Sequence, residues 1–198
     1  MGQEVVKKSL IKCMRSLMRH RTFASIRIED ICDLAGISRR SFYRYYRDKY
    51  ELLSDIYENS YFDKIEKHPE WTVWDYHEEI CRQIYADADF FRHAAQVKGQ
   101  NGFWECCKKQ LLPLTVRDLD VYDGMSGESR AYMKTFFEFD TDVLFTIMEK
   151  WLNTSPMEDP AAFSRKVRRA FEEHARFQVW MTSNYQALAS ALPGVDPQ

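Results

Sequence analysis

Two short helices joined by a tight turn are predicted by residues 28–46, and this stretch constrains the fold more than any other part of the chain. Apolar residues recur at helical spacing in its first half, at Ile28, Ile31 and Ala35. Gly36 can then leave the helix with a positive φ, and Ser38 is a good N-cap for a second helix. The pattern is that of a helix-turn-helix, a unit that presents its second helix to a DNA major groove.

The second helix of this unit has an apolar and a basic side. Phe42 and Tyr46 lie four residues apart, so we expect both to face inward. Arg39, Arg40 and Arg44 then face outward, where they can reach DNA.

Charge is divided unevenly along the chain. Residues 1–50 contain 12 Lys and Arg against 5 Asp and Glu, a balance of +7, and no acidic residue lies between residues 36 and 47. Residues 51–198 contain the other 16 basic residues against 25 acidic ones, a balance of −9. The net charge of −2 therefore conceals a basic head on an acidic body, as expected for a duplex-binding domain joined to a second domain.

From about residue 5 to residue 57 the chain resembles the DNA-binding domain of the TetR (tetracycline repressor) family of bacterial transcriptional regulators. The matching residues are Phe23 and the runs 28–38, 42–46 and 48–53. Arg27 and Thr22 depart from the family's pattern, which usually has a Thr or Ser cap and often a Gly near these positions. A phosphate contact at the first of them would have to come from the arginine. The resemblance implies a dimer that binds operator DNA and responds to a small-molecule effector.

An all-α fold is predicted for the whole chain, because it has only 7 Gly and 6 Pro and few alternating apolar and polar runs. We expect a three-helix helix-turn-helix domain over residues 1–50 and a connector helix that reaches about residue 67. A helical ligand-binding and dimerisation domain then covers residues 68–198, and the boundary lies at His68–Pro69. Within that domain a helix that begins near Phe103 is expected to be interrupted at Pro113.

The candidate DNA contacts come from the turn and the second helix. Arg39 and Arg40 are expected at base edges, where a bidentate arginine prefers guanine. The side chains expected at phosphates are Ser41, Tyr43, Arg44, Tyr45 and Lys49, with Arg27 a weaker candidate and Ser38 included at the turn.

The last two long helices indicate a homodimer. The helix over about residues 129–152 is apolar around most of its circumference, so it has to be covered on two sides. One side is covered by the protein core, and a symmetry-related copy is the simplest cover for the other. A two-fold dimer places two recognition helices in successive major grooves and predicts a palindromic operator. The interface candidates are Phe136, Val143, Ile147, Val167, Phe171, His174, Gln178 and Met181.

Aromatic residues in the second domain leave room for an apolar ligand pocket. The candidate ligand-binding residues are Phe103, Trp104, Phe137 and Trp151. The effector is unknown, and a repressor released by a small molecule is the favoured reading. A ligand-independent regulator and an activator remain alternatives.

Other function classes are less well supported. A thiol-based redox or thiophilic-metal sensor that uses Cys106 and Cys107 is an alternative, although neighbours on a helix point about 100° apart. We expect no enzyme, because the five histidines are scattered and no glycine-rich phosphate loop occurs. We also expect no cofactor, no metal site and no membrane partner, and a cytoplasmic location, because the chain has no apolar span of about 18 residues and no secretory signal.

Overall fold

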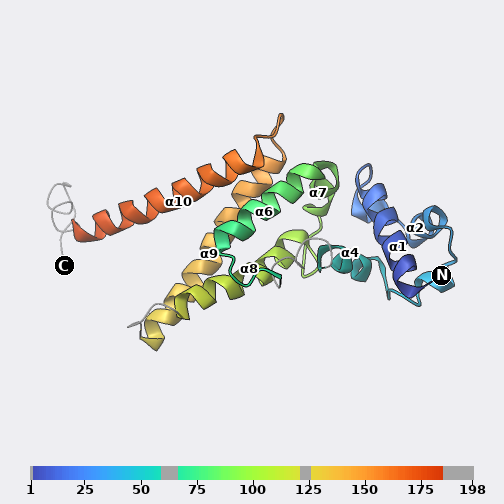
Figure 1. The fold of residues 1–198 in the computed structure, drawn as a ribbon, viewed down its shortest axis with the longest axis horizontal. Helices are drawn as coiled ribbons and strands as arrows, with labels where there is room; N and C mark the ends of the chain where they lie inside the picture. Colours follow the sequence, from blue (N-terminus) through green and yellow to red (C-terminus); the bar gives the residue numbers. More distant parts are fainter. Residues whose placement is uncertain (1, 59–66, 121–125, 185–198) are drawn as a thin grey trace.

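The computed structural model describes residues 2–58, 67–120 and 126–184, with the side chains of residues 115–120 left out. These residues form helices and turns without a strand, which confirms the predicted all-α fold. The elements are α1 (Gln3–Met18), η1 (Phe23–Ser25), α2 (Ile28–Ala35), α3 (Arg39–Phe42), α4 (Lys49–Tyr57), α6 (Val73–Ala86), α7 (Ala88–Ala94), α8 (Phe103–Asp120), α9 (Gly127–Leu152) and α10 (Pro160–Ser183). Figure 1 shows an elongated molecule with α1 and α2 at one end and α10 reaching toward the other.

The N-terminal domain is a small bundle in which α1 packs against both α2 and α4. Leu10 and Met14 of α1 are fully buried, and so are Ile31 and Phe42 from the helix-turn-helix. Asp48 caps α4, since its carboxylate accepts hydrogen bonds of 2.9 Å from the amides of the second and third helical positions, Tyr50 and Glu51.

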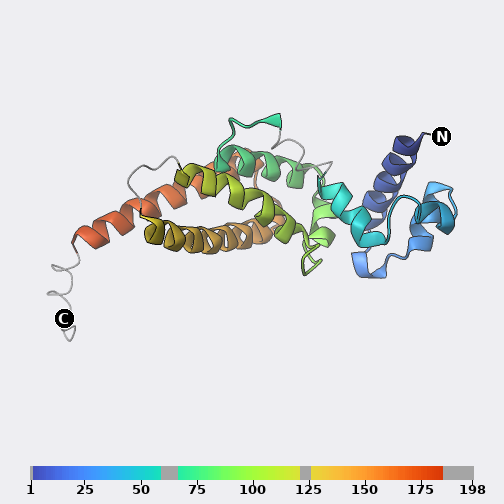
Figure 2. The same cartoon turned by 90° about the horizontal axis from the view of Figure 1, so that it is seen from below.

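The second domain is built from α6, α8, α9 and α10, with α7 between it and the N-terminal domain (Figure 2). Its closest pairs are α10 with α6 and α8 with α9. Side-chain caps begin these helices where the sequence supplies them: Thr72 caps α6 by accepting from the amide of Asp75 at 3.3 Å. Asp159 caps α10, where Pro160 occupies the first turn and needs no hydrogen-bond acceptor for its nitrogen.

Helix α8 corrects the predicted break at Pro113, because it continues through this residue to Asp120. A proline removes one hydrogen bond, the bond to the carbonyl of Lys109. Both Pro113 and Lys109 are exposed, so water can take the place of the missing donor. Residues 59–66 of the predicted connector lie outside the described residues, as do residues 121–125 and 185–198.

Polar contacts join α1 to the start of α7. Asp87, which precedes α7 and is 8% exposed, accepts from Arg15 and from Arg19 of α1, both at 2.7 Å. His93 Nδ1 also lies 2.5 Å from the carbonyl oxygen of Met18. Burial raises the pKa of the Asp87 carboxyl, but the hydrogen bonds from Arg19 and Arg15 outweigh this and hold the pKa below its usual value. The two domains are therefore linked by a charged clamp that does not involve α4.

Candidate nucleic-acid interface

The turn of the helix-turn-helix is made by the predicted residues. Gly36 has φ 66°, a left-handed conformation that ends α2, and the Ile37 amide donates to the Cys32 carbonyl at 3.0 Å. Ser38 then begins α3, since its Oγ accepts from the Ser41 amide at 3.1 Å. The prediction that Ser38 is an N-cap is confirmed, and this use of its oxygen fixes the angle between the two helices.

Helix α3 is shorter than the predicted second helix, because regular helix ends at Phe42. The chain continues in tight turns, in which the Tyr45 amide donates to the Phe42 carbonyl at 2.9 Å. These turns bring Tyr46 into the core at 2% exposure, where its hydroxyl donates to the Asp55 carboxylate of α4. Lys7 of α1 lies over the Tyr46 ring at 5.2 Å. The predicted inward positions of Phe42 and Tyr46 are confirmed, and they hold α3 against α1 and α4.

The outward side of α3 carries one paired and two free arginines. Arg39 donates to Glu29 of α2 at 2.7 Å, and hydrogen bonding to Tyr43 together with the Glu29 charge raises the pKa of this arginine. Arg40 and Arg44 are exposed and have no hydrogen-bond or ion-pair partner within the described part of the chain. Two guanidinium groups, one on α3 and one in the turn that follows it, are therefore available to a ligand.

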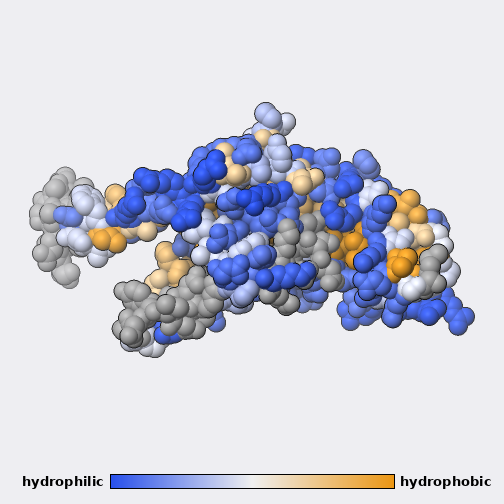
Figure 3. All heavy atoms as spheres, in the orientation of Figure 1, coloured by the Kyte–Doolittle hydropathy of each residue, from blue (hydrophilic) through white to orange (hydrophobic). Residues whose placement is uncertain are grey.

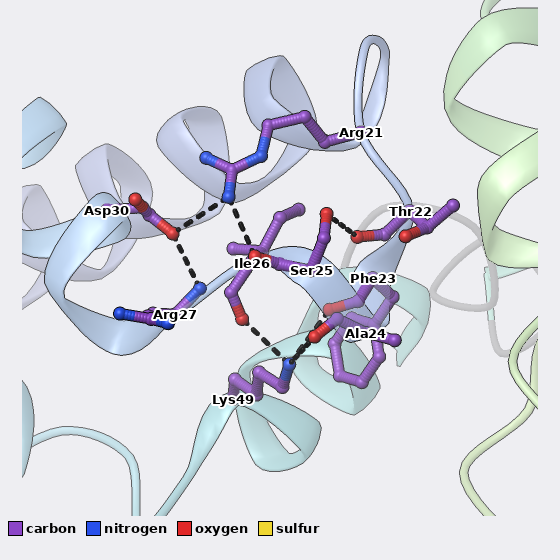
Figure 4. A network of polar contacts seen from close by, with 9 residues as sticks. All are labelled: Arg21, Thr22, Phe23, Ala24, Ser25, Ile26, Arg27, Asp30 and Lys49. Carbon is purple, nitrogen blue, oxygen red and sulfur yellow. Dashed lines mark hydrogen bonds and ion pairs between the residues drawn. The ribbon is translucent and has the colours of Figure 1, made fainter.

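Lys49 requires a correction. We expected its ammonium at a phosphate, but it donates to the carbonyls of Phe23, Ala24 and Ile26 at 2.8, 3.4 and 2.7 Å (Figure 4). It also lies 4.5 Å from the centre of the Phe23 ring. Burial lowers the pKa of this lysine. Since its ammonium is directed at carbonyl oxygens of residues 23–26, Lys49 fixes the loop between α1 and α2 and is already occupied within the chain.

The neighbouring loop explains how α2 begins without a cap hydroxyl at Arg27. The amide of Arg27 donates to the carboxylate of Asp30 at 2.7 Å, which is the reciprocal half of a capping box (Figure 4). Arg21 donates to the same carboxylate at 3.2 Å and to the Ser25 carbonyl at 2.7 Å. The backbone bond from Arg27, followed by that from Arg21, lowers the pKa of Asp30. The Arg27 side chain stays exposed and available.

The four predicted ligand residues fall into two groups. Phe103 is fully buried in the core, and Trp151 is 4% exposed and stacks on Phe163 at 4.5 Å, so both are packing residues and neither lines the two cavities described next. Trp104 lines a cavity of about 300 Å³ between α8 and α9, and Phe137 lines one of about 180 Å³ among α6, α8, α9 and α10. Aromatic spacing alone did not separate packing residues from cavity walls.

The smaller cavity also contains Asp140, which we did not predict as a site residue. A signal was present in the sequence, since Asp140 directly follows Phe139 in an aromatic run, but Glu138 and Asp142 lie beside it and did not single it out. A carboxylate on the apolar side of a helix is costly unless it has a partner or a function.

The predicted dimer residues differ in exposure. Phe136 and Val143 of α9 are 47% and 51% exposed, and His174 and Gln178 of α10 are exposed as well. Ile147, Phe171 and Met181 are half-buried. Val167 is a correction, because it is 4% exposed in the single chain and packs in the core that α10 shares with α6, which leaves little of it for a second subunit.

Further apolar side chains that we did not predict are exposed on the same two helices. The larger ones are Tyr132, Phe139, Phe177, Val179 and Trp180, at 51% to 69% exposure. Figure 3 shows apolar atoms on the side of the α10 arm that faces the end of α9. Such a surface on a chain of this size is typical of a protein–protein interface.

The thiol alternative has little chemical support. Burial raises the pKa of Cys107 and also that of Cys106, so both sulfurs are held in the protonated, unreactive form. Among the described residues no group of His, Cys, Asp and Glu side chains is arranged to hold a metal ion. None of the helices in the described part of the chain is long and apolar enough to cross a membrane.

Comparison with known proteins agrees with this geometry. Residues 11–56 match the model of the bacterial regulatory proteins of the tetR family. A curated relative, the HTH-type dhaKLM operon transcriptional activator DhaS of Lactococcus lactis subsp. lactis (strain IL1403), is 31% identical over 70 residues. This match spans 35% of the chain and only 37% of that relative.

Solved structures extend the similarity to the second domain. The dihydroxyacetone kinase operon activator DhaS has a TM-score of 0.63 at 18% identity, covering 86% of this chain and 97% of that one. A TetR transcriptional regulator from Streptococcus agalactiae 2603V has a TM-score of 0.62 at 16% identity, with 82% and 91% covered. NalD, the secondary repressor of the MexAB-OprM multidrug efflux pump in Pseudomonas aeruginosa, has a TM-score of 0.61 at 13% identity. The match covers 87% of this chain and 97% of NalD. Residues 11–56 therefore match the DNA-binding domain of the TetR family, and the chain shares its overall fold with these solved transcriptional regulators.

Proposed function

We propose that the chain is a homodimer that reads a palindromic operator, with Arg40 at a base edge and Arg44 at a phosphate. The observation that carries this proposal is the pair of exposed, unpaired guanidinium groups of Arg40 on α3 and Arg44 in the turn after it, a segment anchored by Phe42 and Tyr46. An anchored helix loses little conformational freedom on binding, so an arginine on it can discriminate between bases.

Arg39 is the second candidate for a base edge, and its use requires that it leave Glu29. Both side chains of this pair are more than half exposed, at 56% and 52%. Exposed ion pairs contribute about 0–1 kcal/mol to stability, so it costs little for Arg39 to leave Glu29 and bind a guanine instead. Ser41, Tyr43 and Tyr45 remain proposed phosphate contacts beside Arg44, with the Ser38 turn and the free Arg27 side chain at the edge of the surface.

Dimerisation supplies the second half of the reading surface. Helix α3 has only four residues, so one copy contacts few base pairs. A two-fold dimer through the exposed apolar side chains of α9 and α10 would cover Phe136, Val143 and Trp180 and would pair two copies of α3. Successive major grooves on one face of DNA are about 34–36 Å apart, which is the spacing the two helices then need.

A small molecule in the cavity that Phe137 lines is proposed to release the dimer from DNA, so that the protein acts as a repressor. A coupling of about 1–3 kcal/mol between the two sites changes operator affinity by about 5- to 150-fold. One similar protein is named an activator and another a repressor, so the sign needs its own test. A reporter gene behind the selected operator should rise in expression when the regulator gene is deleted, and a fall in expression would mean activation.

The DNA contacts are tested by selecting binding sites from random duplexes with the full chain and then measuring variants. Arg40→Ala should cost about 1–3 kcal/mol and relax preference at one symmetric pair of positions. Arg44→Ala should weaken binding to all DNA sequences alike. It should also reduce the salt dependence of the DNA affinity by the equivalent of about one phosphate contact per subunit. Arg82→Ala is the matched control, because this arginine is 56% exposed on α6, far from α3. It should change neither the affinity nor the base preference. Unchanged affinity and preference in Arg40→Ala would refute the assignment, as would selected sites without two-fold symmetry.

A further inference from the structure

The cavity of about 180 Å³ among α6, α8, α9 and α10 has apolar walls and one acidic group. Trp74 of α6, Phe137 of α9 and Phe171 of α10 supply aromatic rings, and the Trp74 and Phe171 rings meet edge to face at 5.5 Å. Leu111 of α8 and Leu144 of α9 close the apolar lining. Asp140 is the only ionisable residue among the lining residues in the described part of the chain.

The Asp140 carboxylate has no partner of its own. Nothing within the described residues donates a hydrogen bond to this carboxylate or forms an ion pair with it. The neighbouring Thr141 hydroxyl donates instead to the Phe137 carbonyl at 2.7 Å. Burial raises the pKa of Asp140, and His174 of α10 opposes this shift only in part. The charged form of this carboxylate is therefore poorly compensated by the protein's own groups.

Asp142 shows what a compensated acid on the same helix looks like. It lies two residues further along α9, outside this cavity, and accepts from Lys108 of α8 at 2.7 Å. The difference is that no basic side chain reaches Asp140 from α6 or α8. Apart from His174, no basic side chain among the described residues faces Asp140, so a cationic ligand can supply the positive charge that completes the site.

We infer that this cavity binds a small organic monocation, with Asp140 as its counter-ion and the aromatic rings around its apolar body. A cation is attracted by the faces of aromatic rings as well as by the carboxylate, whereas an anion would meet a second negative charge. A neutral ligand would leave the carboxylate without a partner in a drier site. The inference rests on the proposed function in that the cavity is the proposed effector site, and it adds the chemical class of the effector.

The volume limits the size of this ligand. A cavity of about 180 Å³ is smaller than the roughly 300–1,000 Å³ of sites for drug-sized ligands, so it fits a body of about one substituted ring. Benzyltrimethylammonium has this size and a permanent charge. N,N-dimethylbenzamide and phenylacetate are neutral and anionic probes of similar size.

Calorimetric titration of the full chain with these three probes, without DNA, tests the inference directly. We expect millimolar binding of benzyltrimethylammonium and binding of the other two at least about tenfold weaker. Asp140→Asn keeps the shape and should weaken binding of the cation about tenfold, while Asp142→Asn should leave it unchanged.

Each outcome separates the ligand class from the regulatory role. Equal or tighter binding of the amide or of phenylacetate, no measurable binding of the cation at millimolar concentration, or unchanged binding in Asp140→Asn would overturn the inference. If the cation binds through Asp140 but operator affinity does not change, the inference holds and the effector role fails. If the unliganded wild type bound no operator at all, the DNA-binding proposal would be refuted, and the measurement of cation binding would remain valid.

Discussion

Replacing Asp87 by Asn is expected to destabilise the protein more than any other single exchange of an acid for its amide on α6 or α7. The carboxylate is 8% exposed and accepts from Arg15 and Arg19, both at 2.7 Å. Charge-assisted hydrogen bonds contribute about 1.5–3 kcal/mol each, but the two arginine side chains are 29% and 47% exposed, so solvent screening reduces this. We expect a combined loss of about 2–3 kcal/mol, because burial of Asp87 keeps part of the interaction dry.

Urea denaturation at neutral pH, with the slope compared as well as the midpoint, measures this loss. For a chain of this length each kcal/mol corresponds to about 2–4 °C in Tm. Asp89→Asn is the matched control on α7, because Asp89 also pairs with an arginine, Arg92, at 2.7 Å, but it is 68% exposed. Its expected cost is less than about 1 kcal/mol.

The effect of Asp87→Asn should also depend on pH, and the sign follows from the lowered pKa of Asp87. A carboxyl with a lower pKa in the folded state stabilises the protein above its unfolded value of 3.8, and this contribution is lost as the pH falls through the folded value. The difference in unfolding free energy between wild type and variant should therefore be constant from pH 5 to 7, since pH 5 already lies roughly one unit above the unfolded pKa. It should shrink in more acidic solution. A loss no larger than that of Asp89→Asn, or one that grows in acid, would refute the clamp.

Three further predictions concern the assignments made above. Lys49→Met should lower Tm and weaken DNA binding together, because it leaves partly buried carbonyls of the η1 segment without donors; weaker DNA binding at unchanged Tm would restore the phosphate contact. Trp180→Asp should raise the dimer dissociation constant at least about tenfold by sedimentation analysis, because it places a charge in an apolar interface. Tyr85→Asp, similarly exposed on α6, is its control, and equal effects would contradict an interface on α9 and α10. Cys106→Ser should leave operator affinity unchanged with and without mild peroxide, because the raised thiol pKa keeps this sulfur unreactive; a lost peroxide response would support the thiol sensor.

Local chemistry was sufficient to predict the helix-turn-helix. Gly36 and Ser38 act through the conformation and hydrogen bonds of residues within three positions of them, so their roles can be read without knowledge of distant contacts. The inward positions of Phe42 and Tyr46 were also predicted from their spacing, although local turns after Phe42, and not a continued helix, bring Tyr46 into the core. The all-α fold followed from composition and from the period of the apolar residues.

The tertiary structure alone decided what each helix face meets. Periodicity placed Val167 on an apolar stripe, but only packing against α6 makes it a core residue and leaves Trp180 on the outer part of the same helix exposed. Lys49 looked like a free cation in sequence, and the carbonyls that bind it lie 23 to 26 residues earlier. Asp87 and Asp140 each lie near other acidic residues in the sequence, and only their environments, which come from other helices, set them apart. A hydrophobic pattern predicts that one face of a helix is covered. What lies against that face depends on contacts between residues far apart in the chain, such as the two arginines at Asp87 or the aromatic cavity at Asp140.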